Sequence, residues 1–256
     1  MLSKKIDTLR KHSEQLNKYT AGLLDSDGYI GIHFKKNSNG RYSSYLQMAI
    51  CQTDTTILHQ LCKAYRLGTV YADRWTLNNK ESHILLGRIG KHLRIKATHS
   101  DNILWLLSEL KGWSVASKDD LTEYIRCSRL NSRWRKEPKH LAWAWMAGYF
   151  DGDGHYRVRI GRKRTYSNGS TAITNELKLF VGSADYDAFI LNHLHRIHGG
   201  SIGTRKDGCR FWQLSLGRNS RTKALRFLKQ LRKYALIPKK VAAIEQMIAF
   251  HTTRRD

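Results

Sequence analysis

The chain has 256 residues, with 45 lysines and arginines against 21 acidic residues, a formal net charge of +24 and a mean hydropathy of −0.54. This length accommodates one large domain, or two of roughly 100–130 residues that each bury a core. No run approaches 18 apolar residues, so we expect no membrane span. The basic surplus is spread along the chain and favours a nucleic-acid partner, with a membrane-surface or ribosome-associated protein as the alternative.

The first residues, MLSKKIDTLRKHSEQLNKY, contain no apolar h-region, which argues against a secretory signal, and their acidic residues weaken a transit-peptide interpretation. The four cysteines form no CxxC pair and have no His-x₃₋₅-His partner for zinc; they are Cys51, Cys62, Cys127 and Cys209. We expect free thiols in an intracellular, reducing compartment, either a bacterial cytoplasm or an organelle such as a mitochondrion or chloroplast.

One short string occurs twice. TAGLLDSDG at Thr20–Gly28 and MAGYFDGDG at Met146–Gly154 share the frame Ala-Gly-x-x-Asp-x-Asp-Gly, and Asp151 stands 126 positions after Asp25 (151 − 25). Five fixed positions recur by chance in a chain of this length with a probability of about 10⁻⁴. The two strings therefore indicate a duplication.

Each string closes a predicted helix, over Ser13–Leu24 in the first copy and Leu141–Phe150 in the second, and its glycine can take the positive φ that ends a helix. The apolar period then changes from helical to two, which predicts a strand with one apolar face and one basic or small face. The apolar positions are Ile30, Ile32 and Phe34, then Tyr156, Val158 and Ile160.

Asn-Gly turns at 37–41 and 165–171 predict that each strand continues as a hairpin into a return strand. The order then repeats: a helix, a second hairpin, another helix and an LxxK segment. The predicted ranges are helices at Asp54–Tyr65 and Asp185–His198, hairpins at Thr69–Arg88 and Ser201–Arg218, and LxxK segments at Leu93–Lys96 and Leu236–Lys239.

The predicted fold is therefore α+β. It consists of two pseudo-symmetric αββαββα halves, each an antiparallel sheet with helices on one face. We place the first half at residues 1–126, a basic linker at 127–139 and the second half at 140–256.

The repeated string suggests a chemistry. Ala21-Gly22 and Ala147-Gly148 would let two helices approach closely, and their packing would set Asp27 beside Asp153. Two carboxylates at one junction repel each other unless a cation lies between them, and a divalent metal suits their oxygens. Metals in this position can activate water and stabilise the leaving oxygen in phosphodiester hydrolysis.

A calcium-binding loop and a purely structural helix cap are the alternative roles for the aspartates. An EF-hand loop with Gly28 at its sixth position would have Phe34 at its twelfth, where a glutamate belongs, and the second copy would have Ile160 there. A purely structural role, in which the aspartates cap helix ends, fits Asp25 and Asp151 better than Asp27 and Asp153.

The two strings resemble the paired signature motifs of the LAGLIDADG homing endonucleases in their single-chain, two-motif form. The likeness runs from about Lys18 to Phe250, because the hairpins and LxxK segments follow the family's order as well. It implies that the motif helices pack between the halves and that saddle-shaped sheets lie in the DNA major groove. It also implies that Asp27 and Asp153 bind two or three Mg²⁺ ions, with Mn²⁺ as a substitute, for hydrolysis of both strands. The resemblance further implies a monomer with a long double-stranded recognition site.

The resemblance extends to further active-site residues, but the two halves of the chain do not match the family equally well there. Gln52 matches a polar residue that organises active-site water, but its counterpart in the second half is Ser183. Lys96 matches a basic residue near the scissile phosphate, with Lys239 or Lys240 as its partner. Thr20 and Met146 stand where the motif has its leading Leu, and Leu24 and Phe150 where it has Ile, at positions that should serve packing.

Basic and polar residues on the outward strand faces are the candidate DNA contacts. Arginine can fork to guanine, and asparagine can pair with adenine. The candidate base readers are His33, Lys35, Asn37, Arg157, Arg159 and Lys163. Arg41, Arg74, Arg205 and Arg210 could instead neutralise phosphate only. The alternative is a merely solvated basic face.

Three functions are compatible with these residues. The first is a sequence-specific double-strand DNA endonuclease. The second is an RNA-binding intron maturase on the same fold, and the third is a DNA-binding regulator that has lost the chemistry. Both motif aspartates and both LxxK lysines are present, which favours retained catalysis.

Overall fold

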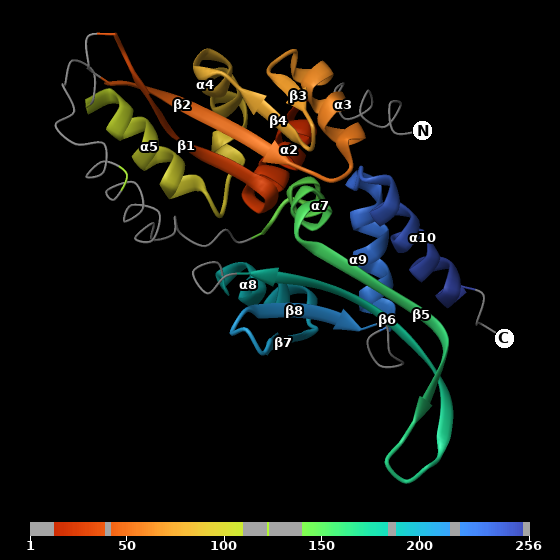
Figure 1. The fold of residues 1–256 in the computed structure, drawn as a ribbon. Coiled ribbons are helices and arrows are strands. Elements are labelled where there is room, and N and C mark those ends of the chain that lie inside the picture. Colours follow the sequence, from red (N-terminus) through yellow and green to blue (C-terminus); the bar gives the residue numbers. More distant parts are fainter. Residues whose placement is uncertain are drawn as a thin grey trace. The chain divides into compact units, whose positions relative to one another are not determined.

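The computed structural model, drawn in Figure 1, describes residues 13–38, 42–109, 122, 140–183, 188–215 and 221–252. The predicted linker at 127–139 lies outside these residues. The chain forms two compact units, residues 1–152 and 153–256. The helix of the second motif belongs to the first unit, because it packs on the helix of the first motif.

The first unit contains a four-stranded antiparallel sheet in the order β1-β2-β4-β3. Its elements are α2 (Ser13–Asp27), β1 (Gly28–Lys36), β2 (Tyr42–Cys51), α3 (Thr55–Tyr65), β3 (Thr69–Tyr71), β4 (Arg74–Leu77), α4 (Asn79–Ile89), η1 (Gly90–His92), α5 (Ala97–Glu109) and α7 (Trp143–Gly152).

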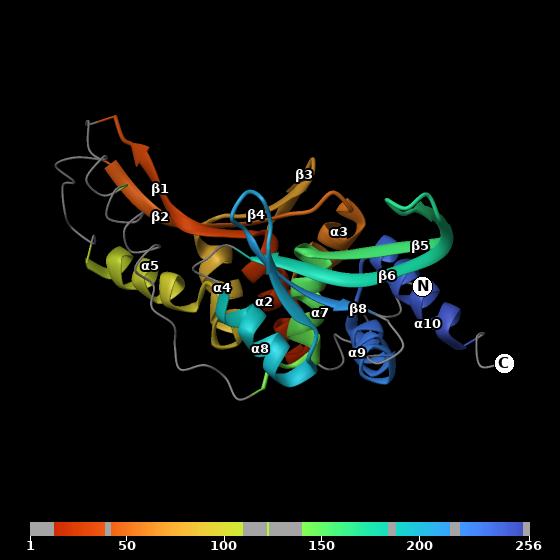
Figure 2. The same ribbon diagram turned by 90° about the horizontal axis from the view of Figure 1, so that it is seen from below.

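Buried and exposed side chains alternate along β1, and this alternation determines which face of the sheet is covered. Ile30 and Ile32 are buried, while His33 and Lys35 are exposed. Figure 2 shows helices α2, α4 and α5 on one side of the β1–β2 pair, and the described helices leave the other side uncovered. The predicted apolar-in, basic-out pattern is therefore confirmed for this strand.

The second hairpin is shorter than predicted. It ends at Leu77, and the segment predicted to extend the strand to Arg88 is helix α4 instead. Asn78 caps this helix: its side chain accepts from the backbone N–H of Glu81 at 3.0 Å, and the Glu81 carboxylate accepts from the Asn78 N–H at 3.0 Å. This capping box stabilises the helix start, so the strand prediction for residues 78–88 is wrong.

The second unit repeats the sheet order as β5-β6-β8-β7, again antiparallel. Leu177, Leu179, Val181 and Trp212 supply its buried face, against which α8, α9 and α10 pack. Its elements are β5 (Gly154–Thr165), β6 (Thr171–Ser183), α8 (Ala188–His198), β7 (Ser201–Thr204), β8 (Arg210–Ser215), α9 (Arg221–Tyr234) and α10 (Pro238–Thr252).

Strand β5 departs from simple alternation in its middle. Its register with β6 shifts between Arg159 and Arg162, where Gly161 has a φ of +68°. A bulge of this kind adds one residue to a strand and reverses the faces beyond it. Lys163 consequently pairs with Ile173, on the side of the sheet opposite to Arg157 and Arg159, so its predicted place on their face is wrong.

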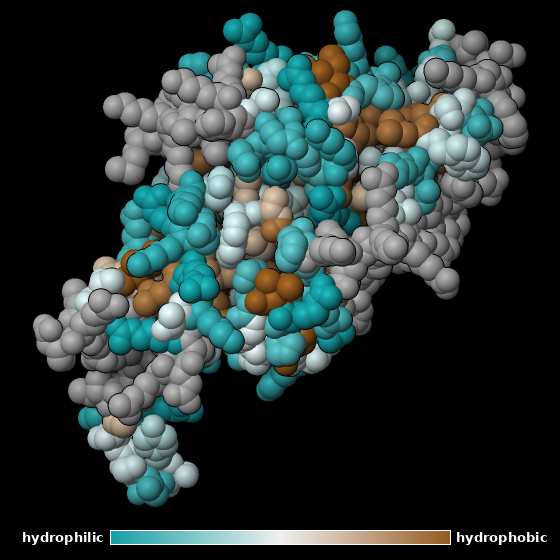
Figure 3. Space-filling view, turned by 180° about the vertical axis from the view of Figure 1, so that it is seen from behind, coloured by the Kyte–Doolittle hydropathy of each residue, from teal (hydrophilic) through white to brown (hydrophobic). Residues whose placement is uncertain are grey.

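The αββαββα order predicted for each half is confirmed, with helices covering one face of each antiparallel sheet. Among the described residues, no helix is both long and apolar enough to cross a membrane. The described surface seen in Figure 3 is mostly hydrophilic, with apolar residues in small groups. This agrees with the few large apolar side chains that are exposed, such as Tyr71 and Trp105.

Candidate active site

The two motif helices, α2 and α7, pack with their backbones in contact. A Cβ atom on Gly22 would lie 2.0 Å from the carbonyl oxygen of Trp145, and one on Gly148 would lie 2.0 Å from that of Tyr19. No side chain fits at such a separation, so the paired glycines permit this approach. The close packing predicted from the Ala-Gly pairs is confirmed.

Hydrogen bonds cross between the same helices in a reciprocal pattern. The Tyr19 hydroxyl donates to Oδ2 of Asp151 at 2.7 Å, and Nε1 of Trp145 donates to Oδ2 of Asp25 at 2.9 Å. Tyr19 and Trp145 hold equivalent positions in the repeat, as do Asp25 and Asp151. Both aspartates are buried, so the first aspartate of each motif joins the helices and is not open to a ligand.

Asp25 also holds the LxxK segment against the end of α2. Its carboxylate accepts from the backbone N–H of Arg94 at 2.7 Å and of Lys96 at 2.8 Å. Burial raises the pKa of Asp25, while Lys96 and these N–H donors act in the opposite direction. One buried carboxylate therefore fixes both the partner helix and the segment that carries Lys96.

Lys96 lies at the C-terminal end of α2. Its Nζ donates to the carbonyl oxygens of Leu24 at 2.9 Å and of Asp25, and lies 3.4 Å from that of Ser26. An ammonium group here satisfies carbonyls that the helix leaves open and opposes the negative end of its dipole. The structure thus places the Lys96 charge within one residue of Asp27 along the helix.

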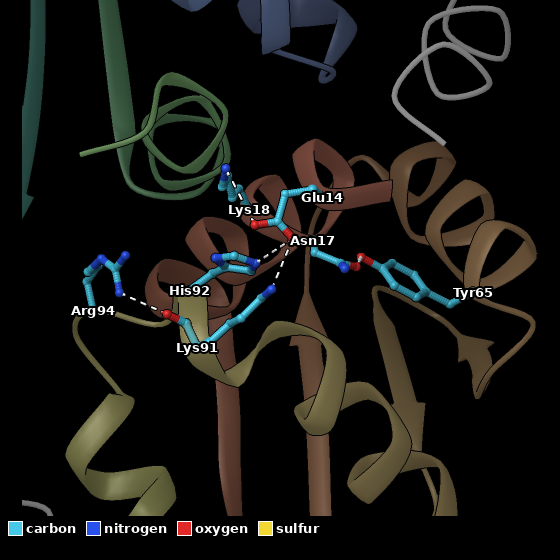
Figure 4. Close-up of polar contacts among 7 residues, drawn as sticks. All are labelled: Glu14, Asn17, Lys18, Tyr65, Lys91, His92 and Arg94. Atoms are coloured by element: carbon cyan, nitrogen blue, oxygen red, sulfur yellow. Dashed lines mark hydrogen bonds and ion pairs between the residues drawn. The ribbon is translucent and has the colours of Figure 1, made fainter. Parts of the chain in front are cut away.

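The far end of α2 is fixed by a separate polar cluster, drawn in Figure 4. The Glu14 carboxylate lies 3.3 Å from Nζ of Lys91 and 3.3 Å from Nε2 of His92. Asn17 accepts from the Tyr65 hydroxyl at 2.9 Å. With both ends held, α2 presents its last residue from a rigid support.

That last residue is Asp27, which is half-buried. Nε2 of Gln52 donates to Oδ2 of Asp27 and lies 3.5 Å from the carbonyl oxygen of Asp151. A Cβ atom on Gly152 would lie 3.1 Å from Oδ2 of Asp27, so this carboxylate lies against the backbone of Gly152. Asp153 is the next residue in the chain. The structure thus brings together Asp27, Gln52 and Lys96, the three site residues predicted in the first half.

In the second unit, Asp153 is exposed and directly precedes β5. His155 follows two residues later on the outward face, and sequence reasoning missed it. Burial lowers the pKa of His155, and the positive charges of Arg157, Lys240, Arg205 and Lys239 lower it further. The charges of Lys239 and Lys240 therefore act on His155 near the start of β5, and their role as partners of Lys96 stays a prediction. The Ser183 side chain lies outside the described part of the chain.

The predicted DNA contacts do not all lie on the outward faces of the sheets. Exposed residues on the outward faces are His33, Lys35, Arg74 and Arg159, with Arg157 half-exposed there. The exposed Asn37 donates to the Ser43 hydroxyl at 2.8 Å, and the exposed Arg205 directly follows β7. Arg210 lies on β8 on the same face as the buried Trp212 and Leu214, which is the face that the helices cover. Arg41 lies outside the described residues.

A family model described as LAGLIDADG endonuclease matches residues 146–251. Residues 146–251 belong to the LAGLIDADG endonuclease family. No curated protein matches the chain in sequence.

Solved LAGLIDADG structures share the fold over nearly the whole chain. I-AabMI bound to uncleaved DNA has a TM-score of 0.68 at 14% identity, over 93% of this chain and 90% of that one. I-GzeII with its DNA target has a TM-score of 0.70 at 14% identity, over 94% and 92%. I-LtrWI bound to target DNA has a TM-score of 0.70 at 17% identity, over 94% and 92%. The predicted two-motif, single-chain form is confirmed.

Four departures of the two motifs from the LAGLIDADG string lie inside the helix packing. Thr20, Leu24, Met146 and Phe150 are all buried, and the Tyr65 hydroxyl donates to Thr20 Oγ1 at 3.0 Å. These four side chains therefore fill the core around the motif helices. At the helix ends, Ser26 and Gly152 stand in place of the motif's second alanine, and both final aspartates, Asp27 and Asp153, are present.

Proposed function

We propose that this chain is a sequence-specific DNA endonuclease that hydrolyses both strands of a duplex with divalent metal bound at Asp27 and Asp153. One observation carries the proposal. The Asp27 carboxylate lies at the end of its motif helix against the backbone of Gly152, the residue that precedes Asp153.

The residues at this place fit a hard divalent cation. Asp27 is half-buried and Asp153 is exposed, so neither residue is enclosed in the core. Among the described residues, no group of three or more His, Cys, Asp or Glu is placed to hold a metal, which argues against an all-protein cage. Mg²⁺ accepts few protein ligands and keeps water and phosphate oxygens as the others, and Mn²⁺ would substitute. Two or three such ions would supply activation of water and stabilisation of the leaving oxygen.

Neighbouring residues of the chain would orient these carboxylates and the DNA. The amide of Gln52 donates to Asp27 and so fixes the direction of its oxygens. Lys96, held on the carbonyls that end α2, supplies a positive charge for the scissile phosphate. Lys239 would do the same in the second half, with Lys240 beside it, and the unequal pair Gln52 and Ser183 predicts unequal cleavage rates on the two strands.

The outward sheet faces would bind the duplex. They carry His33, Lys35, Arg157 and Arg159 without a described helix over them, and I-AabMI, I-GzeII and I-LtrWI are DNA-bound structures of this fold. Because one chain contains both motif helices, we propose that it acts as a monomer on a long recognition site.

A cleavage selection on randomised duplexes tests the function. The full chain is incubated with the library in Mg²⁺ and, in parallel, in Ca²⁺ to retain bound but uncut sequences. We expect one long recognition sequence, cut on both strands in Mg²⁺. A bound sequence that is never cut would indicate a regulator, and neither binding nor cutting of DNA would indicate an RNA maturase.

A further inference from the structure

Phe180 is an apolar side chain on the outward face of the second sheet. On β6, Leu177, Leu179 and Val181 are buried in the core, so Phe180 points to the opposite side, where it is half-exposed. That side also carries the polar residues Lys178 and Gln213 and a second half-exposed aromatic ring, Phe211. Because the Phe180 ring does not fill the core, its place on this face must have another role.

Three basic or titratable side chains contact this ring. The His155 ring, on the paired position of β5, has its centroid 4.5 Å from that of Phe180. Cζ of Arg157 lies 5.6 Å from the Phe180 centroid, and Cζ of Arg205 lies 5.9 Å from it. Both distances are those of a guanidinium attracted to the face of an aromatic ring. One phenylalanine thus gathers two arginines from different parts of the chain.

Contact with the Phe180 ring affects how much rotational freedom the two arginines lose when they bind a base. A free arginine loses much rotational freedom when its planar fork is fixed on a base, and a group held in place beforehand loses less. Guanine presents two acceptors in the major groove that match this fork. Contact with the Phe180 ring would therefore restrict Arg157 and Arg205 before any ligand arrives.

Among the described residues of the first half, the equivalent positions hold no aromatic ring with two arginines beside it. Tyr29 holds the position of His155 after the motif glycine, and its paired residue is Ala49, where the second half has Phe180. Gly31 stands where the second half has Arg157, and the Tyr29 side chain lies over it, since a Cβ there would meet Tyr29 Oη at 2.1 Å. The two outward faces are therefore different at the same distance from the motif.

We propose that Phe180 is a positioning residue that holds Arg157 and Arg205 for recognition of guanines in the DNA half-site bound by the second sheet. This inference rests on the proposed function. It predicts that sequence preference in that half-site depends on the aromatic ring itself, and not only on the two charges.

The test is a binding selection on randomised duplexes at one salt concentration, with the full chain in Ca²⁺. Wild type is compared with Phe180→Met, Phe180→Leu, Phe180→Tyr, Arg157→Gln and Arg205→Gln. A bidentate arginine contributes about five- to 150-fold discrimination between bases. We expect both non-aromatic variants to lose about fivefold or more of the preference at the base pairs that the arginine variants affect. Phe180→Tyr should retain it, and each variant should unfold at the wild-type temperature.

A double variant separates positioning from general damage. In the Arg157→Gln background, Phe180→Met should cause no further loss at the base pair that Arg157 reads. A wild-type preference in both Phe180→Met and Phe180→Leu, or an equal loss of affinity for every sequence, would overturn this inference alone. A wild-type chain that selects no duplex sequence would overturn the proposed function and this inference together.

Discussion

Tyr19 and Trp145 each direct a polar hydrogen to the buried aspartate of the other motif helix. A hydrogen bond to a buried charged group contributes more than one between neutral groups, because the carboxylate would otherwise lose its hydration without replacement. The first aspartate of each motif thus joins the helices, while the second remains for the proposed chemistry.

Removal of one hydroxyl tests this role. Tyr19→Phe keeps the buried ring and removes the donor to Asp151, so we expect the free energy of unfolding to fall by about 1.5–3 kcal/mol. Tyr71→Phe is the matched control because Tyr71 is 81% exposed, and it should change little. Urea denaturation measures both. Equal stability of the two variants would show that the crossed bond contributes nothing.

His198 predicts a dependence of stability on pH. Its ring packs edge-on against Phe227, with 4.7 Å between the ring centroids. Burial, followed by the charge of His193, lowers the pKa of His198 to about 4 from 6.5. The folded state therefore favours the neutral ring, and its contribution is complete above about pH 6.5 and declines as the pH falls toward 4.

The free energy of unfolding, measured by urea denaturation at several pH values between 7 and 4, checks this. We expect His198→Gln to show a smaller decline than wild type, since it has no ring to protonate. Identical curves for the two proteins would contradict the assignment to His198.

At the scale of elements, the contact between α2 and α7 depends on glycine. Gly22→Ala would place a methyl group 2.0 Å from the Trp145 carbonyl oxygen, so the helices must separate. We expect a loss of at least about 3 kcal/mol in the free energy of unfolding, at the upper end for overpacking.

Gly87→Ala is the matched control. It lies within helix α4, and a Cβ there would meet nothing within 4 Å. We expect this variant to gain about 0.5–1 kcal/mol, because alanine favours the helix over glycine. Thermal and urea unfolding of both variants gives the comparison, and a Gly22→Ala protein as stable as wild type would refute the close packing.

The order of the helices and the covered faces of the sheets could be predicted from the sequence. Both features depend on local periods, which the repeated motif and the alternation along the strands display. The start of α4 was not predicted, because it depends on the capping box at Asn78 and residues 78–88 also fit a strand pattern. The bulge after Arg159 and the pairing of Tyr19 with Asp151 depend on register between separate segments, which no local period encodes.

At the scale of the whole molecule, the net charge of +24 predicts DNA binding that weakens steeply with salt. A protein with six to ten phosphate contacts loses roughly 10³-fold or more in affinity between 50 and 200 mM salt. Arg74→Gln should reduce the slope of log affinity against log salt by about one, for all sequences alike. Equilibrium binding over a salt series measures this, and a salt-independent affinity would exclude phosphate contacts.

In the proposed function, Asp27 and Asp153 perform the chemistry and are dispensable for DNA binding. The most direct measurement compares wild type with Asp27→Asn and Asp153→Asn on the selected target, with cleavage of each strand followed in Mg²⁺ and affinity measured in Ca²⁺. We predict wild-type affinity and a loss of double-strand cleavage by more than about a hundredfold in each variant, beyond the losses typical of outer-shell partners of a metal. Double-strand cleavage at the wild-type rate by either folded variant would show that the replaced aspartate does not perform the chemistry.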